Sequence, residues 1–370
     1  MLAMPRSGTA QAALDRAVSI LAEHLADTGA TRLDLPHIYE ADALLDLYGE
    51  DLRARAFVYP DPDQGRELCL RPDFTVPVAL VHRASGWDKV ASYTYQGPVF
   101  RRQPPGLQRP VEFVQAGIER FGEDDPVAAD VGVFKTLYRG LAELGLDEPE
   151  VTIGDLSIPF ALLNALEMPE HRRDSLRRHF WRPTRFRDLL MRAQAPSDAR
   201  EVPGDDLDRR ATDAGEPVGL RSIADVTKRL VRLSAARRDP AMTVEQAKLI
   251  DGVLQIRAPA RQALAQLERV TTEAGVDLSV AIRRFADRVE ALDVAGVDMD
   301  RMIFDASFGR NLEYYDGFVF ELRAPGKPDG HPPLAGGGRY DAMTTHLGAS
   351  SPISAVGGII RPEAVLEALA

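Results

Sequence analysis

The stretch GPVFRRQPPGLQRPVEFVQAGIERFG, residues 97–122, sets β-forming residues on both sides of a loop rich in proline and arginine. This stretch and the residues just before it predict paired strands over 90–95 and 111–116. Two later stretches, FGRNLEYYDGFVFE at 308–321 and AGGGRYDAM at 335–343, are similarly rich in charged and aromatic residues. A site for a free amino acid needs an anion for the ammonium group and a cation for the carboxylate. The three stretches together predict a pocket for a zwitterionic amino acid.

Strand patterns occupy both ends of the chain, and a helical pattern occupies the middle. From 159 to 275, leucine, alanine and arginine recur at helical spacing around a polar linker, which predicts a helical insertion. We expect an α+β fold whose mostly antiparallel sheet is split by that insertion. The expected parts are 1–158, 159–275 and 276–370. Other expected elements are strands at 31–35, 56–59, 67–70, 151–153, 303–308, 313–322 and 353–360, and helices at 40–48, 125–144 and 362–370.

The composition is that of a soluble globular protein, with 45% hydrophobic and 27% charged residues. The formal net charge of −11 argues against a surface built for phosphate backbones, so we expect no nucleic-acid partner. The first residues, MLAMPRSGTAQAALD, contain no apolar stretch of the kind found in signal peptides, and the sequence has no run of about 18 apolar residues. These features predict a cytoplasmic protein without a membrane segment.

The cysteine and histidine residues give no sign of metal chemistry. The single cysteine, Cys69, alternates with Leu68 and Leu70, which favours a small buried residue in a strand over a nucleophile. The seven histidines show no metal-ligand spacing. We therefore expect neither a metal nor a cofactor.

Five short motifs, RPDFT, GPVFRR, QAGIE, LEYY and GGGRYD, follow one another between residues 71 and 341. They resemble the catalytic core of histidyl-tRNA synthetase, a class II aminoacyl-tRNA synthetase, and more closely its paralogues, the regulatory subunits of ATP phosphoribosyltransferase. The likeness covers about 10–155 and 300–370. It implies a class II synthetase-like core with helices flanking the sheet. Because the chain stops shortly after the last motif, we expect no anticodon-binding domain.

The resemblance also assigns a histidine pocket. Asp73 stands where the family has the glutamate that binds the α-ammonium group, and Thr75 supports it. The glutamine and glutamate of QAGIE line the amino-acid site. Arg310 corresponds to the arginine near the carboxylate, and Tyr315 and Tyr340 correspond to the tyrosines at the ring. The implied site consists of Asp73, Thr75, Arg101, Gln115, Glu119, Arg310, Tyr314, Tyr315 and Tyr340.

Taken singly, these residues have ordinary structural alternatives. Asp73 suits a turn, Arg310 suits a surface ion pair, and one ring of the pair Tyr314 and Tyr315 suits the core. The glycine run 336–338 alone indicates only a tight backbone path. Their occurrence in order, within five motifs, is what favours a ligand site.

The positions that contact ATP in the synthetase family carry altered residues in this sequence. Arg101 keeps the first arginine that contacts ATP, but Gln103 replaces the glutamate at the adenine amino group. Ala364 replaces the arginine that holds the γ-phosphate, and Arg361 lies three residues earlier, where we expect it on a different face. Losing such a contact removes about 3 kcal/mol of transition-state stabilisation. The resemblance thus implies a chain without catalytic residues.

The implied function is a noncatalytic regulatory subunit of ATP phosphoribosyltransferase, required for the first step of L-histidine biosynthesis and its feedback regulation by histidine. The implied partners are L-histidine and a short-form catalytic subunit, in a hetero-oligomer that contains a homodimer formed around Pro36. Pro36 also suits an ordinary strand end. Two alternatives stay open: a truncated histidyl-tRNA synthetase or histidine-activating ligase, and a binding module that senses histidine or tRNA.

Overall fold

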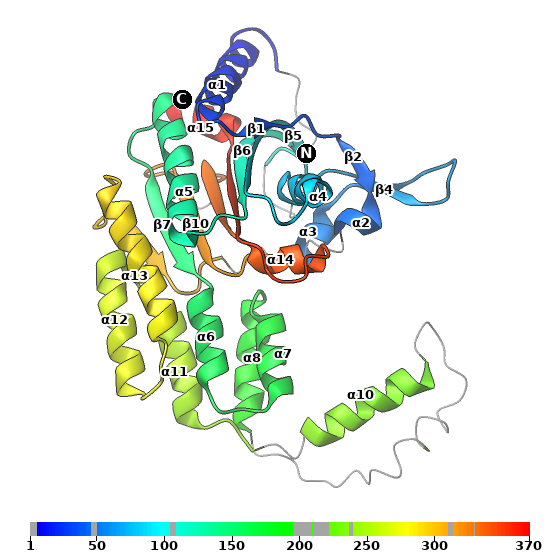
Figure 1. Cartoon of the computed structure of the whole chain (residues 1–370), viewed down its shortest axis with the longest axis vertical. Helices are drawn as coiled ribbons and strands as arrows, with labels where there is room; N and C mark the ends of the chain where they lie inside the picture. The colour runs from blue at the N-terminus through cyan, green and yellow to red at the C-terminus, as the bar shows by residue number, and fades with distance from the viewer. Residues whose placement is uncertain are drawn as a thin grey trace. The chain divides into compact units, whose positions relative to one another are not determined.

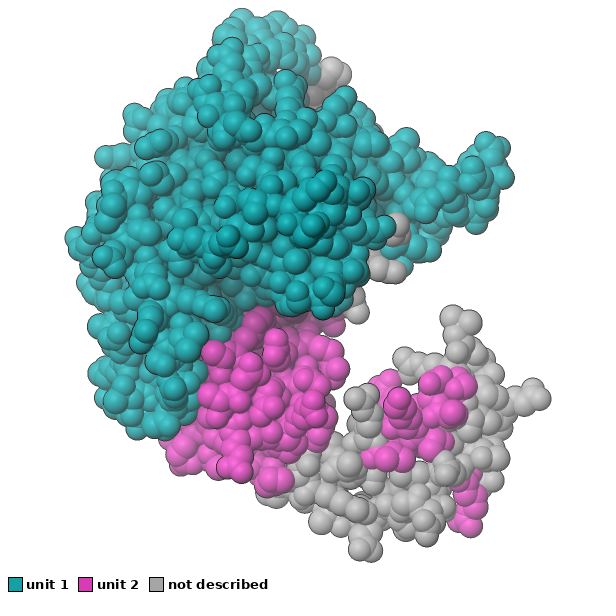
Figure 2. Space-filling model, in the orientation of Figure 1, with its two compact units in different colours: residues 1–159, 253–370 teal, residues 160–252 magenta. Residues whose placement is uncertain are grey.

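The structure, a computed structural model, describes residues 6–45, 50–103, 109–195, 209, 222–236, 240–309, 314–328 and 330–370. The chain divides into two compact units (Figure 2). Unit 1 comprises Met1–Pro159 and Val253–Ala370, and unit 2 comprises Phe160–Gly252.

A large sheet forms the centre of unit 1 (Figure 1). In spatial order its strands are β1 (Thr31–Arg32), β5 (Ala91–Phe100), β6 (Glu112–Phe121), β12 (Ala355–Ile360), β11 (Ala335–Arg339), β10 (Phe318–Arg323), β7 (Glu150–Asp155), β9 (Met302–Asp305) and β8 (Arg257–Pro259). Neighbours run antiparallel except for β1–β5 and β7–β9. The prediction of a mostly antiparallel sheet is therefore confirmed.

Strands β5 and β6 form the long hairpin that the first motif predicts. In their register Tyr93 lies opposite Glu119, and Gly97 lies opposite Gln115. Gln115 and Glu119 are four residues apart on one strand, so their side chains share a face of the sheet. The hairpin is longer than the predicted 90–95 and 111–116, because the backbone pairing continues through Gly97 and Pro98, where strand propensity is low.

Glycines allow β11 and β12 to lie very close together. A Cβ atom at Gly337 would overlap the backbone carbonyl of Gly357 across the strand pair. The sequence predicts only a tight backbone path at 336–338, since glycine has a low strand propensity. The structure shows that this path is a central strand.

Helix α5 (Pro126–Glu143) packs against β11 and β12, close to the predicted helix at 125–144. Asp125 caps it, accepting hydrogen bonds from the backbone N–H groups of Val127 and Ala128 at 3.0 Å each. Helix α1 (Gly8–Ala26) packs against α5 and against α15 (Pro362–Leu369) at the end of the chain (Figure 1).

A smaller sheet orders its strands as β2 (Ile38–Glu40), β4 (Glu67–Leu70) and β3 (Val58–Pro60). Its antiparallel β3–β4 pair is the hairpin predicted at 56–59 and 67–70. Cys69 is fully buried in β4, as its alternation with leucines predicts. Nearby lie the short helices α2 (Ala41–Leu45) and α3 (Glu50–Arg55), and then α4 (Thr75–Ser85).

Unit 2 is helical. It contains most of α6 (Ser157–Ala165), then α7 (Glu170–His179), α8 (Pro183–Gln194), α10 (Ile223–Ala236) and most of α11 (Val244–Leu254). The expected insertion, 159–275, extends further along the chain than this unit, because β8 and α12 (Ala260–Glu273) belong to unit 1. A three-residue strand ending in proline carries no strand signal. Over the described residues, no helix is long and apolar enough to cross a membrane.

Candidate amino-acid site and a neighbouring arginine-lined cavity

A cavity of about 120 Å³ in unit 1 brings together segments that are far apart in the sequence. They are the start of α4, the ends of the β5–β6 hairpin, the segment before β10, and the glycines of β11. Six of the nine predicted site residues line it: Asp73, Thr75, Arg101, Gln115, Tyr314 and Tyr315.

Groups of opposite charge lie close together in this cavity. The Nη2 atom of Arg101 is 3.9 Å from Oδ2 of Asp73. Arg101 also donates a 2.6 Å hydrogen bond from Nε to the carbonyl of Pro72, which orients its guanidinium group. Arg361, just after β12, is a second cation in the lining. Because a free amino acid carries an ammonium and a carboxylate on neighbouring atoms, adjacent carboxylate and guanidinium groups match both of its charges.

Gln115 has a buried polar atom with no hydrogen-bond partner among the residues that the structure describes. Its side chain is 1% exposed, and its Oε1 atom accepts no hydrogen bond from the part of the chain that the structure describes. A buried acceptor without a donor costs about 1–3 kcal/mol. Since Gln115 lines the cavity, a ligand N–H group there would supply the missing donor. The ammonium and imidazole groups of an amino acid such as histidine both carry N–H donors.

Glu119 lies behind the cavity and does not line it. Its Oε1 atom accepts hydrogen bonds from the hydroxyls of Thr75 at 2.9 Å and Tyr95 at 2.8 Å, and Oε2 accepts one from Tyr340 at 2.5 Å. Burial raises the pKa of this carboxyl to about 7, although the three hydroxyls lower it. Thr75 therefore connects Glu119 to the cavity, because it lines the cavity and its hydroxyl donates to Glu119.

The other two predicted residues have different positions. Tyr340 is fully buried and reaches Glu119, but it does not line the cavity. Arg310 lies outside the described residues, although Gly309 before it and Tyr314 after it both belong to the cavity wall.

Buried ion pairs hold the segment around Tyr340. Arg339 pairs with Asp130 at 2.7 Å and with Asp341 at 2.8 Å. Asp316, which directly follows the tyrosine pair, accepts a 3.2 Å hydrogen bond from the backbone N–H of Asp341. These contacts tie the two tyrosine-bearing segments of the site to each other.

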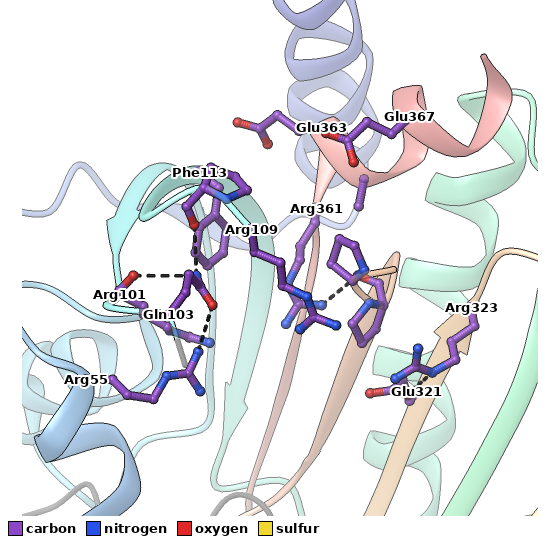
Figure 3. Close-up of a pocket in the computed structure, with 14 residues that line it drawn as sticks. Arg55, Arg101, Gln103, Arg109, Phe113, Glu321, Arg323, Arg361, Glu363 and Glu367 are labelled. Carbon is purple, nitrogen blue, oxygen red and sulfur yellow. Dashed lines mark hydrogen bonds and ion pairs between the residues drawn. The ribbon is translucent and has the colours of Figure 1, made fainter. Parts of the chain in front are cut away.

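A second cavity, of about 230 Å³, adjoins the first (Figure 3). Both cavities share Arg101, Glu321 and Arg361. Gln103 and Ala364, which the resemblance places in the nucleotide site, also line the second cavity. The expectation that Arg361 lies on a different face from Ala364 is wrong. Arg361 precedes α15 in an extended conformation, with φ −109° and ψ 95°, so helical spacing does not set its direction.

Three more arginines line the second cavity, and none of them was among the predicted site residues. Arg323 stands two residues after Glu321 on β10 and so shares its face, a spacing from which it could have been found. Arg55 ends α3 and donates a 3.4 Å hydrogen bond to Gln103 (Figure 3). Arg109 belongs to the loop between β5 and β6. Only the tertiary structure brings these loop and helix residues together.

In the described ranges, no group of three or more His, Cys, Asp or Glu side chains is arranged to hold a metal ion.

Comparison with known proteins gives consistent matches over nearly the whole chain. The family model for histidyl-tRNA synthetase matches residues 8–202 and 221–365. The ATP phosphoribosyltransferase regulatory subunit of Brucella anthropi is 36% identical over 348 residues, covering 89% of this chain and 90% of the relative. The protein of the same name from Mesorhizobium japonicum is 37% identical over 351 residues, with coverages of 89% and 91%.

Solved structures show the same fold at lower identity. An ATP phosphoribosyltransferase regulatory subunit/histidyl-tRNA synthetase from Bacillus halodurans superposes with a TM-score of 0.72 at 21% identity, covering 100% of this chain and 82% of that one. A histidine–tRNA ligase subunit from Alicyclobacillus acidocaldarius gives a TM-score of 0.63 at 22% identity, with coverages of 99% and 95%.

Proposed function

This chain belongs to the ATP phosphoribosyltransferase regulatory subunits, within the histidyl-tRNA synthetase family, and from that premise we propose that its smaller cavity binds free L-histidine. As a member it is a noncatalytic regulatory subunit in histidine biosynthesis. Histidine, the end product of the pathway, would bind this chain in the cytoplasm and thereby change the activity of a short-form catalytic subunit. Inhibition then requires that histidine bind two states of the complex with different affinity.

The unpaired Oε1 atom of Gln115 carries this proposal. Gln115 lines a cavity of about 120 Å³, which suits a single small metabolite, since drug-sized ligands occupy pockets of roughly 300 Å³ or more. Asp73 and Arg101 in the same wall match the ammonium and carboxylate groups. The hydroxyls of the tyrosine pair can donate to or accept from an imidazole ring.

Calorimetric titration of the chain with L-histidine tests the pocket. Gln115→Leu removes the acceptor at similar size, and we expect about tenfold weaker binding, the equivalent of one hydrogen bond. Gln262→Leu, at an exposed position of α12, is the matched control and should bind like the parent. Histidinol, which lacks the carboxylate, should bind more weakly than histidine because Arg101 loses its partner. Absence of histidine binding, both alone and with the catalytic subunit, would rule out the pocket role.

Regulation is tested with a short-form ATP phosphoribosyltransferase catalytic subunit from the same organism. Adding this chain should change the velocity, and histidine should then lower it. A catalytic subunit indifferent to the chain would contradict the proposal. Pyrophosphate exchange dependent on histidine and ATP would support the ligase alternative, and a tRNA gel shift at fixed salt would support the sensor alternative.

We also propose the homodimer around Pro36, because apolar side chains are exposed on the small sheet beside it. Ile38 of β2 is 50% exposed and Val58 of β3 is 40% exposed. Sedimentation velocity should show a dimer that Ile38→Glu converts to a monomer at micromolar concentration. Val280→Glu replaces a residue on α13 (Ser279–Val294) that is 69% exposed, and it should leave the dimer intact. A monomeric parent chain would refute the homodimer.

A further inference from the structure

Asp316 connects the two tyrosine-bearing segments of the smaller cavity through both its backbone and its side chain. Its backbone N–H donates to the carbonyl of Arg339 at 3.0 Å. Its carboxylate oxygens accept hydrogen bonds from the backbone N–H groups of Asp341 at 3.2 Å and Ala342 at 2.5 Å. These two N–H groups begin α14 (Asp341–His346), and the first N–H groups of a helix have no partner within the helix. One residue therefore holds the segment before β10 against the segment after β11.

Asp316 does not line the smaller cavity, but the two residues before it do. Tyr314 and Tyr315 belong to the cavity wall. The ring of Tyr314 lies edge-on to the ring of Tyr340, with 6.0 Å between their centroids. A Cβ atom at Gly338 would come within 3.0 Å of Cδ1 of Tyr315, so this ring lies against β11. The positions of both wall tyrosines therefore depend on how firmly the next residue is held.

The charges around Asp316 are unevenly compensated. Arg339 pairs with Asp130 at 2.7 Å and with Asp341 at 2.8 Å. Asp341 also accepts a 2.7 Å hydrogen bond from the backbone N–H of Ala355. The hydrogen bonds that Asp316 receives in the described part of the chain come from backbone N–H groups. Two carboxyl groups thus meet at the start of one short helix, and the arginine beside them pairs with the other one.

Electrostatic effects agree with this geometry. Burial, followed by repulsion from Asp341, raises the pKa of Asp316 to about 7, although the backbone hydrogen bonds and Arg339 lower it. The held segment therefore favours a neutral carboxyl, whereas an aspartate released into water ionises at about pH 4. By linkage, the proton stabilises the held arrangement at low pH, and this stabilisation is lost as pH rises through about 7.

We propose that Asp316 is a positioning residue for the smaller cavity: its neutral form holds the tyrosine pair against β11 and α14, and its ionisation loosens the pair and weakens ligand binding. This inference rests on the proposed function and deepens it, because histidine binding becomes coupled to a proton near neutral pH. Coupling of this kind is reciprocal, so bound histidine makes Asp316 hold its proton more tightly.

The test is calorimetric titration of the full chain with L-histidine at pH 6 and pH 8.5, for the parent and for Asp316→Asn. The asparagine amide has the shape of the carboxyl group and no charge, so the variant keeps the held arrangement at both pH values. We expect affinities within about twofold of each other at pH 6, and at least about threefold tighter binding by the variant at pH 8.5. The imidazole of the ligand and the carboxyl of Glu119 titrate with both chains, so the comparison at each pH isolates Asp316.

Asp287→Asn is the matched control. Asp287 is exposed on α13 and lines neither cavity, so its replacement removes the same charge and should leave histidine affinity like that of the parent at both pH values. A residue that only supports the fold changes affinity by the same factor at every pH. Equal ratios for Asp316→Asn at the two pH values, or weaker binding by this variant at pH 8.5, therefore overturn the proposal.

The backbone amide of Ala342 gives a second measurement, on the parent chain and without ligand. Because this N–H donates to Asp316, its NMR chemical shift should change with pH around a midpoint near 7. An amide signal that does not titrate between pH 5.5 and 8.5 overturns the proposal even if Asp316→Asn does not fold. A parent chain that binds no histidine at either pH overturns the proposed function as well, whereas histidine binding with equal ratios overturns this inference alone.

Discussion

The carboxylate of Glu119 lies against the α-carbon of Gly357, the residue opposite it on the neighbouring strand. A Cβ atom at Gly357 would overlap Oε2 of that carboxylate. Position 357 must therefore be glycine for Glu119 to remain where it meets Thr75, Tyr95 and Tyr340. The absence of a side chain at Gly357 thus allows the polar cluster around Glu119 to form behind the smaller cavity.

Gly357→Ala should destabilise the chain by about 1–3 kcal/mol, the usual cost of overpacking a core. It should also weaken histidine binding, since the displaced carboxylate releases Thr75. Gly252→Ala is a matched control on α11, where a Cβ atom would meet nothing within 4 Å. Replacing glycine within a helix stabilises by about 0.5–1 kcal/mol. Urea denaturation measures both changes, and equal effects of the two substitutions would contradict the packing argument.

Stability should depend on pH through Glu119. Burial raises its pKa from 4.5 to about 7, so the folded chain holds this proton more tightly than the unfolded chain does. The stabilisation is complete below pH 4.5 and is lost as pH rises through about 7. We expect the free energy of unfolding to fall across this window, and Glu119→Gln to reduce the slope. Burial and the neighbouring Asp341 also raise the pKa of Asp316 to about 7, so a smaller slope should remain in the variant. Urea titrations at several pH values between 5 and 8 measure the pH dependence of the free energy of unfolding. An unchanged pH dependence in Glu119→Gln would exclude Glu119 as its source.

The ion pairs of Arg288 should be essential to unit 1. Burial opposes its charge, but Asp155 and Asp130 outweigh this effect and raise its pKa. Arg288→Met leaves two buried carboxylates with one cation fewer, which should cost about 3–5 kcal/mol of unfolding free energy. Arg284→Met, at an exposed position of the same helix, should change stability by about 0.5 kcal/mol or less. Thermal denaturation compares the two, and similar melting temperatures would refute the prediction.

The thiol of Cys69 should be inert in the folded chain. It is fully buried, and burial raises its pKa to about 11, whereas disulfide exchange requires an accessible thiolate. We expect Ellman's reagent at pH 8 to react at least about a hundredfold more slowly with the native chain than with the urea-unfolded chain. The chain has one cysteine, so the signal has a single source. Rapid reaction of the native chain would show that this strand opens readily.

The predictable part of the fold consists of elements whose patterns are local. β-forming residues on both sides of a loop rich in proline and arginine predicted the β5–β6 hairpin, and the helical spacing of apolar residues predicted α5. By contrast, β11 is made largely of glycine, and no local preference marks it as a strand. β8 is a strand only because β9 offers it an edge to pair with.

The sequence by itself determined the family and the fold class, and it supplied the residues of the proposed amino-acid site, because motif order and hydrophobic periodicity can be read along the chain. The tertiary structure decided which of them form the cavity wall. It placed Glu119 behind Thr75, and it brought Arg361 to the same cavity as Ala364. It also gathered arginines from α3, β10 and the β5–β6 loop around one cavity. Contacts of this kind depend on strand register and on the path of the backbone between elements, and neither is encoded in any single local pattern.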